Sequence, residues 1–396
     1  MNYEKLLNPR VTSIPPSGIR RFFDLASEME DCISLGVGEP DFVTPWDIRD
    51  AAIKSLQAGK TQYTSNAGLI SLREQIAGYV YRRFALSYQP KSEIIVTVGA
   101  SEAIDLALRT LVSEGEEVLI PAPSYVSYRP NVTLVGGVAV EVNLSGENGF
   151  KLTADALKKA ITPKSKALIF PYPNNPTGAI MTKEEMQEIV EVIVKNNLLV
   201  ISDEIYAELT YVKEGHVSIA SLEGMKERTV VINGFSKAFA MTGWRLGYMC
   251  APHEIIEQAY KIHQYTIMCA NTFAQYGAEI ALASGAEDEY ETVRKMRESY
   301  DMRRRYLYNE LNKMGLTCYM PQGAFYIFPC VKVTGLTGER FAQKLLVEKH
   351  VAVVPGNAFG SAGEYYVRCC YATSLADLKT AVSRIREFME ENGWLK

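Results

Sequence analysis

The sequence predicts an α/β protein, with a doubly wound, mostly parallel sheet of seven strands in a large domain and a smaller α+β domain. Three observations lead to this prediction. The chain has 396 residues, of which 47% are hydrophobic, and this is more than one ordinary core needs. From about residue 94, short β-branched apolar runs alternate with longer segments whose apolar residues recur at helical spacing. After about residue 285 this alternation gives way to a long charged helical stretch.

Seven apolar runs are interpreted as the strands of the large domain. Helices cover both faces of such a sheet, so its strands need no alternation of polar and apolar residues. The runs are IIVTVG (94–99), EVLIP (117–121), VAVEV (138–142), KALIFPY (166–172), LLVISD (198–203), TVVING (229–234) and RLGYMCA (245–251). Between them, SEAIDLALRTLV and TKEEMQEIVEVIVKNN have the periodicity of amphipathic helices. Thr182 and Glu185 have the spacing of a capping box at the start of the second helix.

The smaller domain is predicted from residues 286–396 together with residues 1–45, which leaves 46–285 for the large domain. The first 45 residues contain five prolines and cannot form a domain alone, so we expect them to pack with the C-terminal part. That part begins with the helical stretch after residue 285. It continues with strand-like TCYM (317–320) and AFYIFP (324–329), a helix near 339–349, strand-like VAVVP (351–355) and YYVRCCYA (365–372), and a final helix.

Charge and cysteine content exclude several classes of protein. The 42 basic and 46 acidic residues give a net charge of −4 without a long run of one sign, so we expect neither nucleic acid nor a membrane as partner. Seven cysteines without a C-x-x-C pair suit reduced thiols, which indicates a cytoplasmic protein. We find no apolar core of a secretory signal and no run near the roughly 20 residues of a membrane span.

Metal and nucleotide sites are not predicted either. The four histidines, at positions 216, 253, 263 and 350, have no metal-ligand spacing. The sequence has no phosphate loop of the G-x-x-x-x-G-K-[ST] type, and GVGEPD lacks the third glycine of the dinucleotide fingerprint.

Polar residues at the ends of predicted strands point to a ligand site, because open parallel sheets bind ligands at the carboxyl edge. Asp203 ends one strand, Asn175 follows another, and Lys237 follows a third with Arg245 eight positions further on. Alone, an aspartate at a strand end is most often a helix cap or a turn residue, NNPTG is most often a plain turn, and a Ser-Lys pair indicates almost nothing. Together, an amine, a carboxylate, an amide and a guanidinium suit an aldehyde cofactor with a phosphate and a cationic ring nitrogen. The lysine would form an imine with the aldehyde, and the buried carboxylate would keep the ring nitrogen protonated.

Several motifs in order along the chain resemble the pyridoxal-phosphate enzymes of fold type I, specifically class I/II aminotransferases. They are LGVGEPDF (35–42), QYTSNAG (62–68), VGASEAI (98–104), YPNNPTG (172–178), SDEIY (202–206), SKAFAMTGWRLG (236–247) and YYVRCCYA (365–372). Other segments are similar to a bacterial subgroup that acts on acetyl-diaminopimelate, aromatic or aspartate substrates. These are SGIRRF (17–22), KIHQY (261–265), SYDMRRRY (299–306) and GAFYIFP (323–329).

The resemblance implies a role for each residue around pyridoxal 5'-phosphate. Lys237 is implied to form the imine and then to move a proton as the general base. Asp203 is implied to pair with the ring nitrogen, and Asn175 and Tyr206 to donate to the phenolic oxygen. Tyr125 matches the aromatic ring that stacks on the pyridine face. The catalytic residues would therefore be Lys237, Asp203 and Tyr206.

The phosphate is implied to lie at the start of a helix and beside two residues near the lysine. These groups are Gly99, Ala100, Ser101, Ser236 and Arg245. Many relatives have a serine where this chain has Gly234, so one phosphate hydroxyl is missing or comes from elsewhere. Tyr63 matches a tyrosine that reaches the neighbouring subunit's phosphate, which implies a homodimer with shared active sites.

The substrate α-carboxylate is implied to bind Arg368 through two parallel hydrogen bonds, helped by Asn175 and the backbone near Gly38. The implied reaction moves an amino group from an amino acid to a 2-oxo acid, usually 2-oxoglutarate. Some relatives that use aspartate have a lysine where this chain has Ser101, so that contact to a side-chain carboxylate is absent here.

Two alternatives stay open at this point. The same cofactor residues serve β-elimination, so a cystathionine or cysteine-sulfur lyase is the second enzymatic hypothesis. A non-enzymatic sensor domain of a transcription regulator is less favoured, because the roughly 90 residues before the first predicted strand contain no basic recognition helix.

Overall fold

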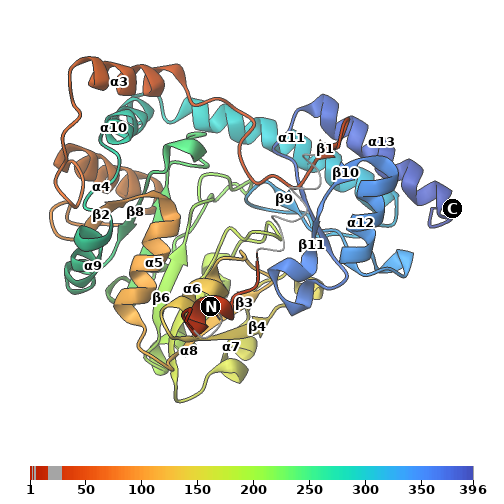
Figure 1. The fold of residues 1–396 in the computed structure, drawn as a ribbon, viewed down its shortest axis with the longest axis horizontal. Helices are drawn as coiled ribbons and strands as arrows, with labels where there is room; N and C mark the ends of the chain where they lie inside the picture. The colour runs from red at the N-terminus through yellow and green to blue at the C-terminus, as the bar shows by residue number, and fades with distance from the viewer. Residues whose placement is uncertain (2, 4–5, 17–28, 396) are drawn as a thin grey trace.

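The computed structural model describes the chain except for residues 2, 4–5, 17–28 and 396, so the SGIRRF motif at 17–22 lies outside the described part. Its central sheet has seven strands in the order β2-β8-β7-β6-β5-β3-β4 (Figure 1). The bounds are β2 Ile94–Thr97, β3 Glu117–Ala122, β4 Val138–Asn143, β5 Ser165–Phe170, β6 Leu199–Asp203, β7 Thr229–Gly234 and β8 Gly247–Cys250. All seven predicted strands are confirmed. Only β8 runs antiparallel to its neighbours, β2 and β7, in this sheet of the described chain.

Helices cover both faces of the sheet, as a doubly wound fold requires. Along β6, Ile201 packs into the cluster formed with α5 and α6, whereas its neighbour Val200 packs against α7 and α8. Because successive side chains of a strand point to opposite faces, these two clusters lie on opposite sides of the sheet. The helices are α3 Trp46–Gln57, α4 Ile70–Phe84, α5 Gly99–Leu111, α6 Tyr128–Leu134, α7 Ala154–Ala160, α8 Lys183–Lys195, α9 His253–Thr266 and α10 Thr272–Glu287.

The capping box of α8 is present as predicted. The Thr182 hydroxyl accepts from the Glu185 amide at 3.3 Å, and a Glu185 carboxylate oxygen accepts from the Thr182 amide at 2.8 Å. Two backbone donors at the helix start are thereby satisfied.

A second layer follows in the C-terminal part, where α11 runs as a long helix from the side of α10 to that of α13 (Figure 1). A three-stranded sheet in the order β11-β12-β9 lies beside these helices. The bounds are β9 Tyr326–Ile327, β10 Val351–Ala352, β11 Val354–Pro355, β12 Val367–Cys370, α11 Glu291–Lys313, α12 Gly338–Lys349 and α13 Leu375–Glu391. The prediction of a strand at 317–320 is wrong. Tyr319 there is 51% exposed and donates to the Glu147 carbonyl, so the segment follows the surface instead of joining a sheet.

The N-terminal segment contacts both layers. Residues of β1 (Ile33–Ser34) pair in parallel with β10, and the Leu35 carbonyl accepts from the Cys370 amide at 2.7 Å. By contrast, α1 (Pro9–Thr12) lies near α6, and Arg10 forms a 2.8 Å ion pair with Glu114. The domain boundaries at 45 and 285 stay a prediction. Within the described residues, no helix combines the length and the apolar character needed to span a bilayer.

Candidate active site

A cavity of about 670 Å³ opens at the carboxyl edge of the central sheet, where it meets β9 and β12. Eleven of the thirteen residues predicted for the site line this cavity. The twelfth, Gly99, directly precedes Ala100 in the chain. The thirteenth, Tyr63, lies outside the cavity with 77% of its surface exposed.

Lys237 follows β7, and its side chain is partly buried in the wall of the cavity. Its Nζ donates a 2.7 Å hydrogen bond to the carbonyl of Gly38. Burial lowers the pKa of Lys237 to about 8, and the cations Arg368 and Arg245 act in the same direction. At pH 7 about a tenth of this amine is therefore unprotonated, far more than for an ordinary lysine, and the unprotonated form is the one that attacks a carbonyl carbon.

Asp203 ends β6 and is 6% exposed. Its oxygens accept from the Tyr128 hydroxyl at 2.7 Å and from the Ile205 amide at 3.2 Å. Burial raises the pKa of Asp203, and these two hydrogen bonds oppose that shift. Among the described residues no cation forms an ion pair with this carboxylate. A cationic ligand atom would supply the missing partner.

Tyr128 is a site residue that the sequence interpretation missed. It stands three positions after Tyr125 in PAPSYVSY, at the start of α6, and the two rings meet edge to face with centroids 5.7 Å apart. Tyr125 precedes α6, and a turn closed by a 3.3 Å hydrogen bond from the Tyr128 amide to the Tyr125 carbonyl brings the two residues together, so no helical pattern in the sequence marked Tyr128.

Arg368 lies on β12 and is 2% exposed. Its Nη1 donates to Asn175 Oδ1 at 2.9 Å and its Nη2 to the Gly36 carbonyl at 2.5 Å, while its buried Nε has no partner within the described chain. The guanidinium lies 4.4 Å from the ring centroid of Tyr326. No carboxylate of the described residues pairs with Arg368, so an anionic ligand group is the natural counter-ion.

The lining of the cavity also includes Ala100 and Ser101 in the first turn of α5, together with Ser236 and Arg245. Arg245 has a φ of +51°, a conformation rare for residues other than glycine and frequent at functional sites. Its Nη1 donates to the Thr242 carbonyl at 3.0 Å. A helix start together with an arginine is the usual setting for a phosphate.

Close packing between β7 and β8 leaves little space at Gly234, the position where many relatives have a serine. A Cβ atom on Gly234 would lie 3.0 Å from the Gly247 Cα, and a Cβ on Gly247 would lie 2.7 Å from the Ala100 nitrogen. The glycines therefore bring β8 close to the start of α5, and a serine at 234 would have little room.

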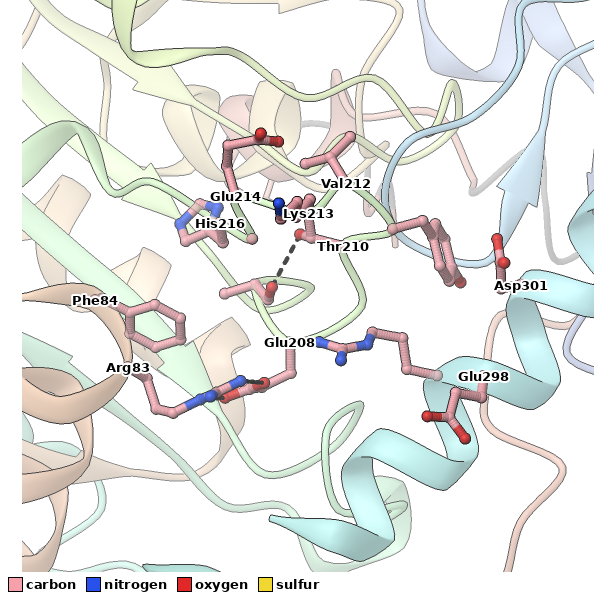
Figure 2. Close-up of a pocket in the computed structure, with 14 residues that line it drawn as sticks. Arg83, Phe84, Glu208, Thr210, Val212, Lys213, Glu214, His216, Glu298 and Asp301 are labelled. Carbon is pink, nitrogen blue, oxygen red and sulfur yellow. Dashed lines mark hydrogen bonds and ion pairs between the residues drawn. The ribbon is translucent and has the colours of Figure 1, made fainter. Parts of the chain in front are cut away.

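A second cavity, of about 630 Å³, contains none of the predicted site residues. Figure 2 shows Arg83 beside Glu208 on one side, with Glu298 and Asp301 of α11 across the opening. Glu208 accepts from Arg83 Nε at 2.8 Å, from Arg83 Nη2 at 2.7 Å and from the Tyr79 hydroxyl at 2.8 Å. Its carboxylate is thus fully paired by protein groups.

The fold and the first cavity together define an α/β enzyme in which a lysine amine and a helix start share one cavity with a carboxylate and an arginine that form no ion pair within the described residues. This set of donors fits a phosphorylated aldehyde with a basic ring nitrogen. The chain belongs to the aminotransferase class I and II family, whose sequence profile matches residues 30–385.

Relatives extend over nearly the whole chain. YugH of Bacillus subtilis, which carries the general name aminotransferase, is 53% identical over 97% of this chain and 98% of that protein. The aspartate aminotransferase of Pyrococcus abyssi is 48% identical over 97% of this chain and 98% of its own length. The crystal structure of the aromatic aminotransferase of Pyrococcus horikoshii is 47% identical, with a TM-score of 0.90 over 94% of this chain and 100% of that chain. The enzyme is therefore an aminotransferase with the fold type I architecture.

Proposed function

We propose that this protein transfers an amino group from an L-amino acid to a 2-oxo acid, with 2-oxoglutarate as acceptor, and that pyridoxal 5'-phosphate is bound through Lys237. The observation that carries this proposal is one cavity that contains both the Lys237 amine, with its pKa lowered to about 8, and the buried Arg368 guanidinium, which pairs with no carboxylate of the described chain. An amino acid needs both groups, one for its amino end and one for its carboxylate.

The residues around Lys237 would hold the cofactor. When bound, it supplies an electron-accepting ring that stabilises negative charge at the substrate α-carbon. Asp203 would keep the ring nitrogen protonated, and Asn175 and Tyr206 would donate to the phenolic oxygen. Tyr125 would pack on the ring face. The phosphate would be held by Gly99, Ala100, Ser101, Ser236 and Arg245.

Arg368 binds and orients the substrate. Its planar guanidinium donates two parallel hydrogen bonds to the α-carboxylate. Asn175 and the backbone at Gly38 help to bind the same carboxylate. The released Lys237 amine then removes the proton from the substrate α-carbon and returns it later, as a general acid and base.

The donor is an acetyl-diaminopimelate, an aromatic amino acid or aspartate, and Ser101 in place of a lysine weighs against aspartate. The test mixes purified, cofactor-loaded protein with each donor and no acceptor, and follows the visible absorption. One donor should convert the spectrum stoichiometrically, and 2-oxoglutarate should restore it. Release of pyruvate and ammonia without an acceptor would instead identify a β-lyase.

The attachment point is tested by borohydride reduction of the loaded protein and peptide mapping. The label should be found on Lys237, and Lys237→Ala should take up no label. A label on another residue of the wild-type protein would contradict the proposed role of Lys237.

We further propose that the protein is a homodimer in which exposed Tyr63 completes the neighbouring site. Lys237→Ala and Tyr63→Ala each lower activity, but a hybrid dimer has one site with neither defect. Random mixing should therefore restore about a quarter of the wild-type activity, since about half of the dimers are hybrids with one intact site of two. No recovery in a preparation shown by mass spectrometry to contain hybrids would contradict a shared site.

A further inference from the structure

Tyr326 lies where three parts of the candidate active site meet. It belongs to β9 and is 1% exposed. Its hydroxyl is 2.8 Å from the Tyr206 hydroxyl, and its ring lies 4.4 Å below the Arg368 guanidinium. A Cβ on Gly38, whose carbonyl accepts from Lys237, would lie only 2.3 Å from the Tyr326 oxygen. The Tyr326 side chain thus contacts Tyr206 and Arg368, and it lies next to Gly38, which accepts the hydrogen bond from Lys237.

The direction of the hydrogen bond between the two tyrosines follows from counting protons. Each hydroxyl has one proton to donate and two lone pairs to accept with. If the Tyr206 proton goes to a ligand oxygen in the cavity, Tyr206 can only accept from Tyr326. Within the described chain the Tyr326 hydroxyl has no other hydrogen-bond partner, so its proton is available for this contact.

When Tyr326 donates to Tyr206, the hydrogen bond that Tyr206 donates to the ligand becomes stronger, because hydrogen bonds in a chain polarise one another. Burial raises the pKa of both Tyr206 and Tyr326, so both stay neutral hydroxyls at physiological pH. The titratable or charged groups around the pair are Arg368, Cys370, Tyr125 and Lys237, whose Nζ lies 5.8 Å from the centroid of the Tyr206 ring.

The ring of Tyr326 has a separate effect on Arg368. A guanidinium over an aromatic face is attracted to the ring by a cation–π interaction, which restricts the position of the guanidinium. Asn175 and Gly36 fix the two Nη groups, while Tyr326 supports the flat face. The fork is therefore oriented before a carboxylate arrives, which lowers the cost of binding.

We propose that Tyr326 is a positioning residue with two separable parts: its hydroxyl donates to Tyr206 and strengthens the Tyr206 contact to the cofactor's phenolic oxygen, and its ring orients Arg368 for the substrate carboxylate. This inference rests on the proposed function. It adds a residue to which the comparisons and the motifs gave no role.

Two variants separate the two parts in the loaded enzyme. Tyr326→Phe keeps the aromatic ring but lacks the hydroxyl that donates to Tyr206. The pH at which the visible absorbance of the lysine-bound cofactor titrates should rise by a few tenths of a unit, because the phenolic oxygen is less stabilised. KM for the amino donor should stay within about twofold. Tyr326→Leu loses both parts, so it should show the same spectral shift and also a rise in KM of about five- to tenfold.

Tyr206→Phe provides the discriminating background. If Tyr326 acts through Tyr206, Tyr326→Phe should add no spectral shift in the Tyr206→Phe protein. An equal shift in both backgrounds, no shift in either, or a raised KM in Tyr326→Phe would overturn the proposal. Thermal unfolding and circular dichroism of all variants identify any loss of fold. Absence of a lysine-bound chromophore in the wild-type protein would instead overturn the proposed function, and this inference with it.

Discussion

The two cavities of the molecule are similar in size but treat charge in opposite ways. In the second cavity Glu208 receives three hydrogen bonds, two of them from the Arg83 guanidinium. In the candidate active site, the described protein groups that contact Asp203 and Arg368 are neutral ones, which are hydroxyl, amide and carbonyl groups and aromatic rings. In the second cavity a protein group neutralises the buried charge of Glu208. In the candidate active site the charges of Asp203 and Arg368 are left for a ligand to neutralise.

This difference has an energetic meaning. A buried charge without a counter-ion destabilises the folded protein, whereas in a buried pair the attraction offsets much of the desolvation cost, and removal of one partner leaves the other charge uncompensated. Removing a charge should therefore reduce activity in the candidate active site and stability in the second cavity. The predictions that follow test this contrast.

The largest effect is expected at Arg368. Arg368→Lys keeps a positive charge but loses the planar fork, so kcat/KM for the amino donor should fall about 10²- to 10³-fold. The free energy of unfolding should fall by no more than about 1 kcal/mol, because no ion pair is broken and the lysine ammonium can replace one of the two hydrogen bonds that Arg368 donates to Asn175 and Gly36. Steady-state kinetics and thermal unfolding measure the two quantities. Arg297→Lys, in the second cavity, is the matched control and should keep full activity. A large loss of stability in Arg368→Lys would break the contrast.

The reverse pattern is expected at Glu208, whose side chain is 3% exposed. Glu208→Gln keeps the shape but leaves the Arg83 fork without its carboxylate. The free energy of unfolding should fall by about 2 kcal/mol, below the value for a fully buried pair because Arg83 is partly exposed. Activity at 25 °C should stay within about twofold.

A control from the same cavity sharpens that test. The Glu298 side chain is 59% exposed at the rim, so Glu298→Gln should cost less than about 0.5 kcal/mol. If the two variants were equally stable, the Glu208 pair would contribute nothing, and the contrast between the cavities would be lost.

Local sequence patterns were sufficient to predict the central sheet. Its strands are continuous apolar runs, and buried parallel strands have that pattern for a physical reason. The segment 317–320 has similar composition but lies on the surface, because strand formation also needs a partner edge that no local pattern specifies. Asp203 and Lys237 were predictable as site candidates, since polar residues at the ends of buried strands reach the carboxyl edge.

Residues that act through other residues were harder to predict. Tyr128 and Tyr326 resemble ordinary core tyrosines in sequence, and both are buried. Their importance comes from the oxygen that each hydroxyl meets, on Asp203 and Tyr206, across 75 and 120 positions of the chain. The second cavity was not predicted either, because Arg83 and Glu208 meet only after folding.

The last and smallest effect concerns the pH at which Lys237 becomes reactive. The amine attacks an aldehyde only when it is unprotonated, so the rate of cofactor capture by the cofactor-free protein should rise with pH and level off above about pH 8, where an ordinary lysine would need a pH above 10.5. Absorbance at a series of pH values gives this midpoint.

The lowered pKa of Lys237 also makes the free energy of unfolding depend on pH. Because the pKa of Lys237 is lower in the folded than in the unfolded chain, the unfolded chain binds more protons between about pH 8 and 10.5. This group's contribution to the free energy of unfolding therefore increases with pH over that range. Arg368→Gln removes a cation that lowers the pKa of Lys237, so the midpoint for capture should move upward. A midpoint that stays unchanged would show that Arg368 does not act on the lysine, and would leave burial and Arg245 as the causes of its lowered pKa.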